Sequence, residues 1–92
     1  MDKAANVFAM RGLYEEALRY QEHSLMLRTE AFGPRSLEAA MSLFAMGRLL
    51  HLQGRDNEAR SYLERALAIR EELLGESDPN TQLILENLAA LD

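Results

Sequence analysis

Apolar residues recur at steps of three and four along most of the chain, which is the period of a helix with one buried face. Between residues 37 and 52 the apolar positions are Leu37, Ala40, Met41, Leu43, Phe44, Met46, Leu49, Leu50 and Leu52. Between residues 57 and 74 they are Ala59, Tyr62, Leu63, Ala66, Leu67, Ile69, Leu73 and Leu74. A strand would show strict alternation of apolar and polar residues instead. Both segments are therefore predicted to be helices.

Single glycines divide this pattern, and glycine readily takes the left-handed conformation that ends a helix. They are Gly12, Gly33, Gly54 and Gly75. Three candidate N-cap residues mark helix starts, namely Ser36, Asp56 and Asp78. We therefore predict five helices, at about 2–11, 14–31, 37–53, 57–74 and 79–91. The short turns between them make neighbouring helices antiparallel.

The chain also repeats itself at a spacing of 42 residues without a gap. Among the matched pairs are Gly12 with Gly54, Glu16 with Glu58, Ala17 with Ala59, Tyr20 with Tyr62, Leu25 with Leu67, Arg28 with Arg70 and Gly33 with Gly75. A fixed period of this length is typical of stacked helical repeats, in which each unit buries its apolar face only against its neighbours. The fold class is therefore predicted to be all-α, with function located on a surface.

Small residues occupy equivalent positions in the two copies. Ala5, Gly47 and Ala89 share one position of the repeat, and Ala17 and Ala59 share another. Small side chains permit two helix axes to approach closely. These positions are therefore the expected contact points between paired helices.

Two stretches carry a more specific signature. Residues 54–59 read Gly-Arg-Asp-Asn-Glu-Ala, and residues 62–75 read Tyr-Leu-Glu-Arg-Ala-Leu-Ala-Ile-Arg-Glu-Glu-Leu-Leu-Gly. They resemble the tetratricopeptide repeat (TPR) family, in particular its 42-residue kinesin light chain type. The resemblance implies antiparallel helical hairpins stacked in a right-handed superhelical array, with about two and a half repeats in a single domain over residues 1–92. The first copy departs from the pattern at Gln21, where an apolar residue is usual.

Composition limits the classes of function. The 92 residues include no cysteine and carry a formal net charge of -5, with 48% hydrophobic and 27% charged residues. This balance is typical of a folded soluble chain, and it excludes disulfides and thiolate chemistry. An acidic chain also lacks the basic surface of nucleic-acid binders. No apolar run is long enough to cross a membrane and no secretion signal is evident, so we expect a cytoplasmic protein without nucleic-acid or membrane partners.

His23 and His51 are the side chains best suited to acid–base or metal chemistry. Glu22 directly precedes His23, so the two side chains diverge on a helix, and no acidic residue lies three or four positions from His51. A metal site needs several converging ligands, and catalysis needs a positioned group beside the base. We therefore predict solvated histidines, no cofactor, no metal and no enzymatic activity.

The resemblance also implies where a partner would bind, because relatives hold a peptide on the concave surface formed by one face of each repeat's first helix. In this chain the equivalent positions are Lys3, Asn6, Phe44, Arg48, His51, Glu86 and Asn87. Amides and cations can bond a peptide backbone or a carboxylate, and Phe44 offers an apolar anchor. The leading hypothesis is therefore a scaffold that binds a protein or peptide in this groove.

Two alternatives remain open. The last predicted helix contains Glu86 as its only charge, whereas the final helix of an array usually turns a polar face outward. A second copy of the chain or an absent downstream repeat could cover its positions Leu85, Leu88 and Ala89, and a second copy would make the chain a homodimer. The chain could also be a regulatory fragment of a larger protein.

Overall fold

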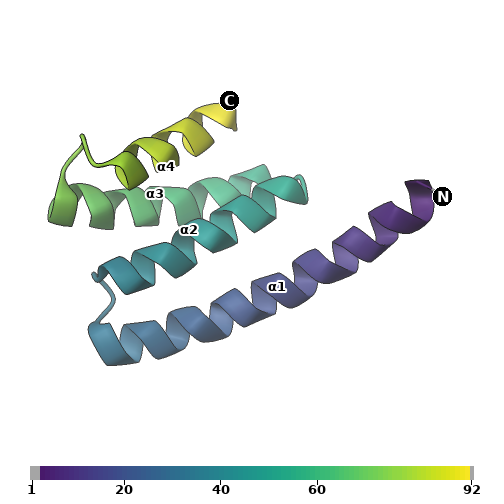
Figure 1. Cartoon of the computed structure of the whole chain (residues 1–92), viewed down its shortest axis with the longest axis horizontal. Coiled ribbons are helices and arrows are strands. Elements are labelled where there is room, and N and C mark those ends of the chain that lie inside the picture. The colour runs from purple at the N-terminus through teal and green to yellow at the C-terminus, as the bar shows by residue number, and fades with distance from the viewer. Residues whose placement is uncertain (1–2, 92) are drawn as a thin grey trace.

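The chain folds into a row of four helices. The computed structural model describes residues 3–91, with side chains described from Gly12 to Leu91. The helices are α1 (Lys3–Phe32), α2 (Leu37–Leu52), α3 (Asp56–Leu74) and α4 (Pro79–Ala90). Consecutive helices run antiparallel and pack against each other in chain order (Figure 1). All regular structure in residues 3–91 is helical, which confirms the predicted all-α class.

The prediction of five helices is wrong at the N-terminal end, where the segments predicted at 2–11 and 14–31 form the single helix α1. Positive φ angles, which end a helix, occur at Gly33 (95°), Gly54 (80°) and Gly75 (84°). Gly12 lies inside α1 and does not adopt one. Helix starts favour Ser, Thr, Asp, Asn or Pro, but Gly12 is followed by Leu13 and Tyr14. Because nothing caps a new helix there, α1 continues through the glycine at a cost of about 1 kcal/mol relative to alanine.

Two of the three predicted N-caps are confirmed. The Ser36 hydroxyl accepts a hydrogen bond from the Ala39 backbone N–H at 3.1 Å, at the start of α2. The Asp78 carboxylate accepts from the backbone N–H groups of Asn80 and Thr81 at 3.0 and 3.3 Å, at the start of α4. These bonds satisfy N–H groups that have no partner within the helix.

The third predicted N-cap is wrong. Asp56 is the first residue of α3 rather than the residue before it, and the N-cap position belongs to Arg55, whose side chain makes no capping bond. The Asp56 carboxylate lies instead beside the ring of His51, across the turn between α2 and α3. Asp56 therefore fastens the turn.

Two connected groups of buried apolar side chains hold the four helices together. The first joins α2, α3 and α4 through Ala40, Leu43, Leu63, Ala66, Ile69 and Ile84. The second joins α1, α2 and α3 through Leu18, Met46, Leu50 and Ala59. Leu25, Tyr62 and Leu91 are partly buried and pack against both groups. The core is therefore continuous from α1 to α4.

Gly47 lets α2 and α3 approach closely, as its position in the repeat predicts. A Cβ atom here would lie 2.6 Å from Leu63 Cγ and 3.3 Å from the Ala59 carbonyl oxygen. Ala89, at the same repeat position, is exposed on α4, and the side chain of Ala5 lies outside the described residues. The close contact is therefore seen at the second copy.

A polar contact links α1 to α2. The Arg28 guanidinium donates from Nη1 to the buried Ser42 hydroxyl at 3.1 Å and to the Glu38 carbonyl oxygen at 3.4 Å. This contact fixes the C-terminal half of α1 against α2. Within residues 3–91, none of the helices has the length and hydropathy of a membrane span.

Candidate functional site

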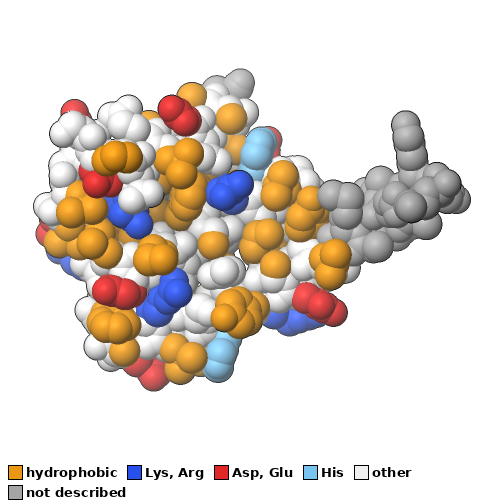
Figure 2. Space-filling view, viewed as in Figure 1, with side chains coloured by type: hydrophobic (Ala, Val, Ile, Leu, Met, Phe, Trp, Pro, Cys, Tyr) orange, Lys and Arg blue, Asp and Glu red, His pale blue; other side chains and the backbone are white. Residues whose placement is uncertain are grey.

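α2 carries three of the predicted groove residues. Arg48 is exposed and His51 is partly exposed, whereas Phe44 is partly buried and packs against the core group of α2, α3 and α4. The opposite face of α2 turns to the core with Ala39, Ala40, Ser42, Leu43, Met46, Gly47 and Leu50. Met41 extends the outward face and has half of its side chain exposed. On the surface seen in Figure 2, hydrophobic side chains are interspersed with charged ones rather than gathered in a single patch.

Arg48 and Phe44 form a stacked pair on this face. The guanidinium carbon of Arg48 lies 5.8 Å from the centroid of the Phe44 ring, within the range of a cation–π contact. The planar guanidinium that stacks on the ring has N–H groups in a fork that matches a carboxylate. The pair therefore presents an apolar surface and a directed charge side by side.

His51 has an acidic partner that the sequence interpretation missed. Its Nδ1 lies 2.9 Å from the Asp56 carboxylate, and both side chains are about half exposed. The expectation that His51 lacks acidic company is therefore wrong, although its side chain remains 37% exposed. Asp56 is five positions away, too far for a helix pair, and only the turn at Gly54 brings the two side chains together. Because the His51 ring bonds to Asp56 across the turn, the turn fixes the orientation of the ring.

The predicted residues on α4 differ in how available they are. Glu86 is exposed, whereas Asn87 is half-buried and donates its Nδ2–H to the Leu83 carbonyl oxygen at 2.8 Å. Asn87 therefore keeps its side-chain oxygen as the atom best placed to accept from a ligand. The side chains of Lys3 and Asn6, predicted for the same groove, lie outside the described residues.

The residues predicted for self-association also lie on α4. Leu85 and Ala89 are exposed, with 37% of Leu85 accessible to solvent. Leu88 is partly buried and packs against the core group of α2, α3 and α4. Two of the three positions are thus open for contact, and the third supports the fold.

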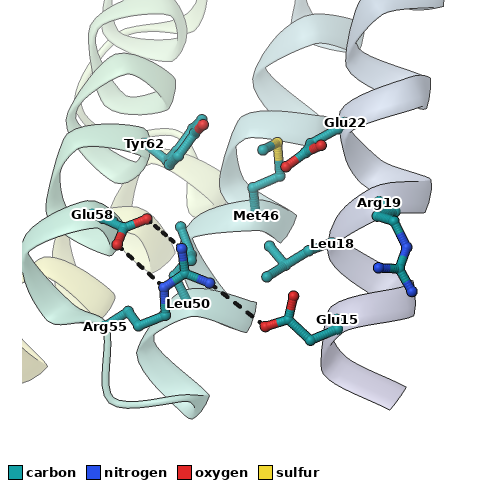
Figure 3. A pocket seen from close by; sticks show the side chains of 9 residues that line it. All are labelled: Glu15, Leu18, Arg19, Glu22, Met46, Leu50, Arg55, Glu58 and Tyr62. Carbon is teal, nitrogen blue, oxygen red and sulfur yellow. Dashed lines mark hydrogen bonds and ion pairs between the residues drawn. The ribbon is translucent and has the colours of Figure 1, made fainter. Parts of the chain in front are cut away.

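A pocket of about 140 Å³ lies on the other side of α2, between α1 and α3. Figure 3 shows its apolar floor of Leu18, Met46 and Leu50, and a rim of charged side chains from three segments. The rim and walls comprise Glu15, Arg19 and Glu22 of α1, Arg55 of the turn, and Glu58 and Tyr62 of α3. Sequence reasoning missed this pocket because its residues come together only through helix packing.

Arg55 connects the two walls of the pocket. Its Nη2 lies 2.6 Å from the Glu58 carboxylate, and its Nη1 lies 3.7 Å from Glu15 of α1. The hydrogen bond to Glu58, with the charges of Glu58 and Glu15, raises the pKa of the Arg55 guanidinium above its ordinary value. Gln53 adds a hydrogen bond from its Nε2 to Glu15 at 2.9 Å. The pocket rim is therefore a set of paired charges around an apolar floor.

The outward face of α2 and the pocket differ in the groups that they carry. Within residues 12–91, no group of three or more His, Asp or Glu side chains is placed to hold a metal ion. The outward face of α2 offers an aromatic ring and a stacked cation, and the pocket offers a small apolar floor. Such features anchor a partner's side chains.

A family model described as tetratricopeptide repeat matches residues 1–72, more than half of the chain. The chain belongs to the tetratricopeptide repeat family. In TPR terms, α2 and α4 are first helices of successive repeats, α3 is a second helix, and the part of α1 after Gly12 aligns with α3 at the 42-residue spacing. The outward face of α2 thus belongs to a first helix, whereas the pocket lies between two second-helix positions.

Two curated proteins share the TPR segment. Clustered mitochondria protein homologs from Culex quinquefasciatus and Aedes aegypti are each 34% identical to this chain over 71 residues. The match covers 77% of this chain and 5% of each mosquito protein. The likeness is therefore that of one repeat segment to a small part of much longer proteins.

Proposed function

We propose that this TPR chain is a non-catalytic interaction scaffold that binds a peptide or protein segment across the outward face of α2, extended by α4. The TPR family supports a role in protein–protein interaction. Met41, Phe44 and Arg48 of α2 share 42-residue spacing with Leu83, Glu86 and Ala90 of α4. Ala40 and Leu43 of α2 share a core group with Ile84 of α4, which supports the proposal that one partner contacts both helices.

The stacked Arg48–Phe44 pair carries the proposal. An exposed arginine ordinarily loses side-chain entropy when it binds a partner, but stacking on an aromatic ring has already restricted the side chain. Met41, half exposed one turn before Phe44, adds an adaptable apolar surface. Together they suit a partner segment with a carboxylate beside an apolar side chain.

The α4 part of the surface defines the rest of the proposed ligand. Glu86 can accept from a cationic side chain or an amide, and the Asn87 side-chain oxygen can accept from a backbone N–H. A net charge of -5 favours the approach of partners with basic residues. The proposed ligand is therefore a segment of mixed charge with at least one apolar anchor.

The test is selection of peptides from a random displayed library on the wild-type chain, followed by titration calorimetry. Arg48→Glu combined with Asn87→Ala should weaken the selected peptides about tenfold or more, because it replaces a donor by a repelling charge. Arg65→Glu is the matched control, since Arg65 also stacks on an aromatic ring, 5.7 Å from the centroid of Tyr62 on α3.

Equal losses in both variants would show that the α2 face is not the binding surface. Failure to enrich any peptide, from a chain shown by circular dichroism to be folded, would also contradict the proposal. Neither variant should change the oligomer mass, because Arg48, Asn87 and Arg65 are not among the apolar positions Leu85, Leu88 and Ala89 predicted for self-association.

Self-association through α4 is the second candidate. Leu85 is 37% exposed and Ala89 is exposed, on a helix whose only charge is Glu86. If a second copy covers this face, Leu85→Glu should lower the oligomer mass in solution and leave peptide binding unchanged. A third candidate, a regulatory segment of a longer protein, agrees with the small share of the mosquito proteins that the chain matches.

A further inference from the structure

One face of α1 carries an ordered stripe in which four positions are exposed and two, Ala17 and Ser24, are partly buried. Large side chains stand at Leu13, Tyr20 and Leu27, which are 62%, 69% and 50% exposed. Small side chains stand between them at Ala17, Ser24 and Ala31. The spacing alternates between four and three residues, so all six positions follow one face of the helix. Figure 2 shows hydrophobic side chains along the lower edge, where α1 lies in Figure 1.

The second copy of the repeat buries or partly buries four of these six positions, whereas the equivalents of Leu13 and Ala31, which are Arg55 and Leu73, are exposed. Ala17, Tyr20, Ser24 and Leu27 correspond at the 42-residue spacing to Ala59, Tyr62, Ala66 and Ile69 of α3. Ala59 and Ala66 are fully buried, Ile69 is 7% exposed and Tyr62 is partly buried, because α2 and α4 pack over them. The stripe on α1 is therefore a helix-binding face without a helix on it among the described residues.

The chain's own preceding segment is poorly suited to cover this face. α1 runs straight on through Gly12 instead of turning back. The second hairpin is held by the contact between His51 and Asp56. The equivalent positions in the first copy are Ala9 and Tyr14, which cannot form this contact. Leu63, which packs on Gly47, is replaced by Gln21. The features that close the second hairpin are thus absent from the first.

We infer that a second copy of this chain covers the stripe, with the two α1 helices paired antiparallel about a two-fold axis that passes between Tyr20 and Ser24 on the stripe face. In this register the numbers of two residues that face each other across the interface add up to about 44. Each large side chain then meets a small one of the partner: Leu13 lies over the partner's Ala31, Tyr20 over the partner's Ser24, and Leu27 over the partner's Ala17. The contact spans about 27 Å of helix.

Self-complementarity is the reason for choosing a second copy over another protein. A two-fold interface requires the same surface on both sides. When the second α1 runs in the opposite direction, its small positions lie opposite the large positions of the first, and its large positions lie opposite the small ones. Small residues at every seventh position allow the two axes to approach, as they do at Gly47 between α2 and α3. One contact opposes the pairing, because Glu16 of each copy lies near the partner's Glu30.

The first test is the oligomer mass measured by analytical ultracentrifugation over a range of micromolar concentrations. The wild-type chain should form a dimer, and Leu27→Glu should raise the dimer dissociation constant about a hundredfold or more, because it removes two buried leucines. Leu85→Glu on α4 is the matched control and should leave this dimer intact. A wild-type monomer, or a dimer lost in Leu85→Glu and kept in Leu27→Glu, would overturn the inference.

The second test uses the opposing charges to fix the register. Glu30→Lys places a cation near Glu16 of the partner on both sides of the axis, so the dimer should tighten about two- to fivefold. A different partner or a different register gives no such gain. Weaker association of Glu30→Lys would contradict the antiparallel pairing.

The third test exploits the absence of cysteine from the chain. In the double variant Ala17→Cys with Leu27→Cys, oxidation should yield a covalent dimer on a non-reducing gel. The two positions lie about 15 Å apart on one helix, too far for a disulfide within a copy. Each single variant should stay uncrosslinked, and efficient crosslinking of either single variant would refute the register.

Discussion

At the scale of single residues, Gly47 sets the distance between α2 and α3. The α3 atoms nearest to it belong to Leu63, which is fully buried, and to the Ala59 backbone. Because the backbone oxygen is fixed and the leucine is tightly packed, a methyl group at position 47 would have no space. Gly47 is therefore required by packing, although it lies inside a helix where glycine is intrinsically unfavourable.

Gly47→Ala should lower the free energy of unfolding by about 1–3 kcal/mol, because overpacking outweighs the gain in helix propensity. Urea unfolding followed by circular dichroism measures the change. A higher unfolding midpoint in the variant would show that the helices separate easily at this contact.

Sequence reasoning reached Gly47 but not the pairing of His51 with Asp56. Gly47 is visible because it shares a repeat position with Ala5 and Ala89, and small residues at one position indicate a close approach. The histidine pair depends on the path of the turn at Gly54, which periodicity does not describe. An acidic side chain at a turn can cap the next helix or bond to a residue across the turn, and the path of the backbone decides which of the two it does.

At the scale of elements, the length of α1 is the main departure from the predicted helices. The glycine pattern predicted equal breaks at Gly12 and Gly54, yet only Gly54 has the left-handed conformation, with φ of 80°. The starts of α2 and α4 were predictable because Ser36 and Asp78 accept hydrogen bonds from the first turn. A glycine without a following cap does not by itself end a helix.

The same substitution at the two glycines should therefore have opposite effects. Gly12→Ala should raise the free energy of unfolding by about 0.5–1 kcal/mol, since a Cβ there meets no atom within 4 Å and the position is helical. Gly54→Ala should lower it by about 1–2 kcal/mol because of its positive φ. Thermal unfolding of both variants measures this, and a loss of stability in Gly12→Ala would indicate a turn at Gly12.

At the scale of the whole molecule, the shared residues of the two core groups couple the helices. Leu25 of α1, Tyr62 of α3 and Leu91 after α4 each pack against both groups. A repeat array in which each helix touches only its neighbours can lose its ends first. Here the shared side chains connect the first helix to the last through a short core.

We therefore expect cooperative unfolding from residue 12 onward. Urea transitions followed by circular dichroism and by tyrosine fluorescence should coincide, since helix content and the environment of Tyr62 depend on the same core. Separate midpoints for the two signals would show that α1 or α4 detaches first. Measurements below and above the proposed dimer dissociation constant separate this effect from association.

The candidate surfaces could be predicted only in part. The outward face of α2 follows from helical periodicity, because the positions that turn to the core fix the positions that do not. The pocket between α1 and α3 could not be predicted, since Glu15, Arg55 and Glu58 meet only when three segments pack together. Periodicity predicts which face of one helix is buried. Contacts among several helices can be predicted only when the positions of the helices relative to one another are known.

The three turn glycines stand 21 residues apart, at positions 33, 54 and 75. The stretch from residue 34 to residue 75 consequently begins directly after the bend at Gly33 and ends with the equivalent bend at Gly75. A gene that duplicated or excised this 42-residue stretch would splice one bend onto another and leave each flanking helix intact. Growth or shortening of the protein by whole units is thereby compatible with its architecture.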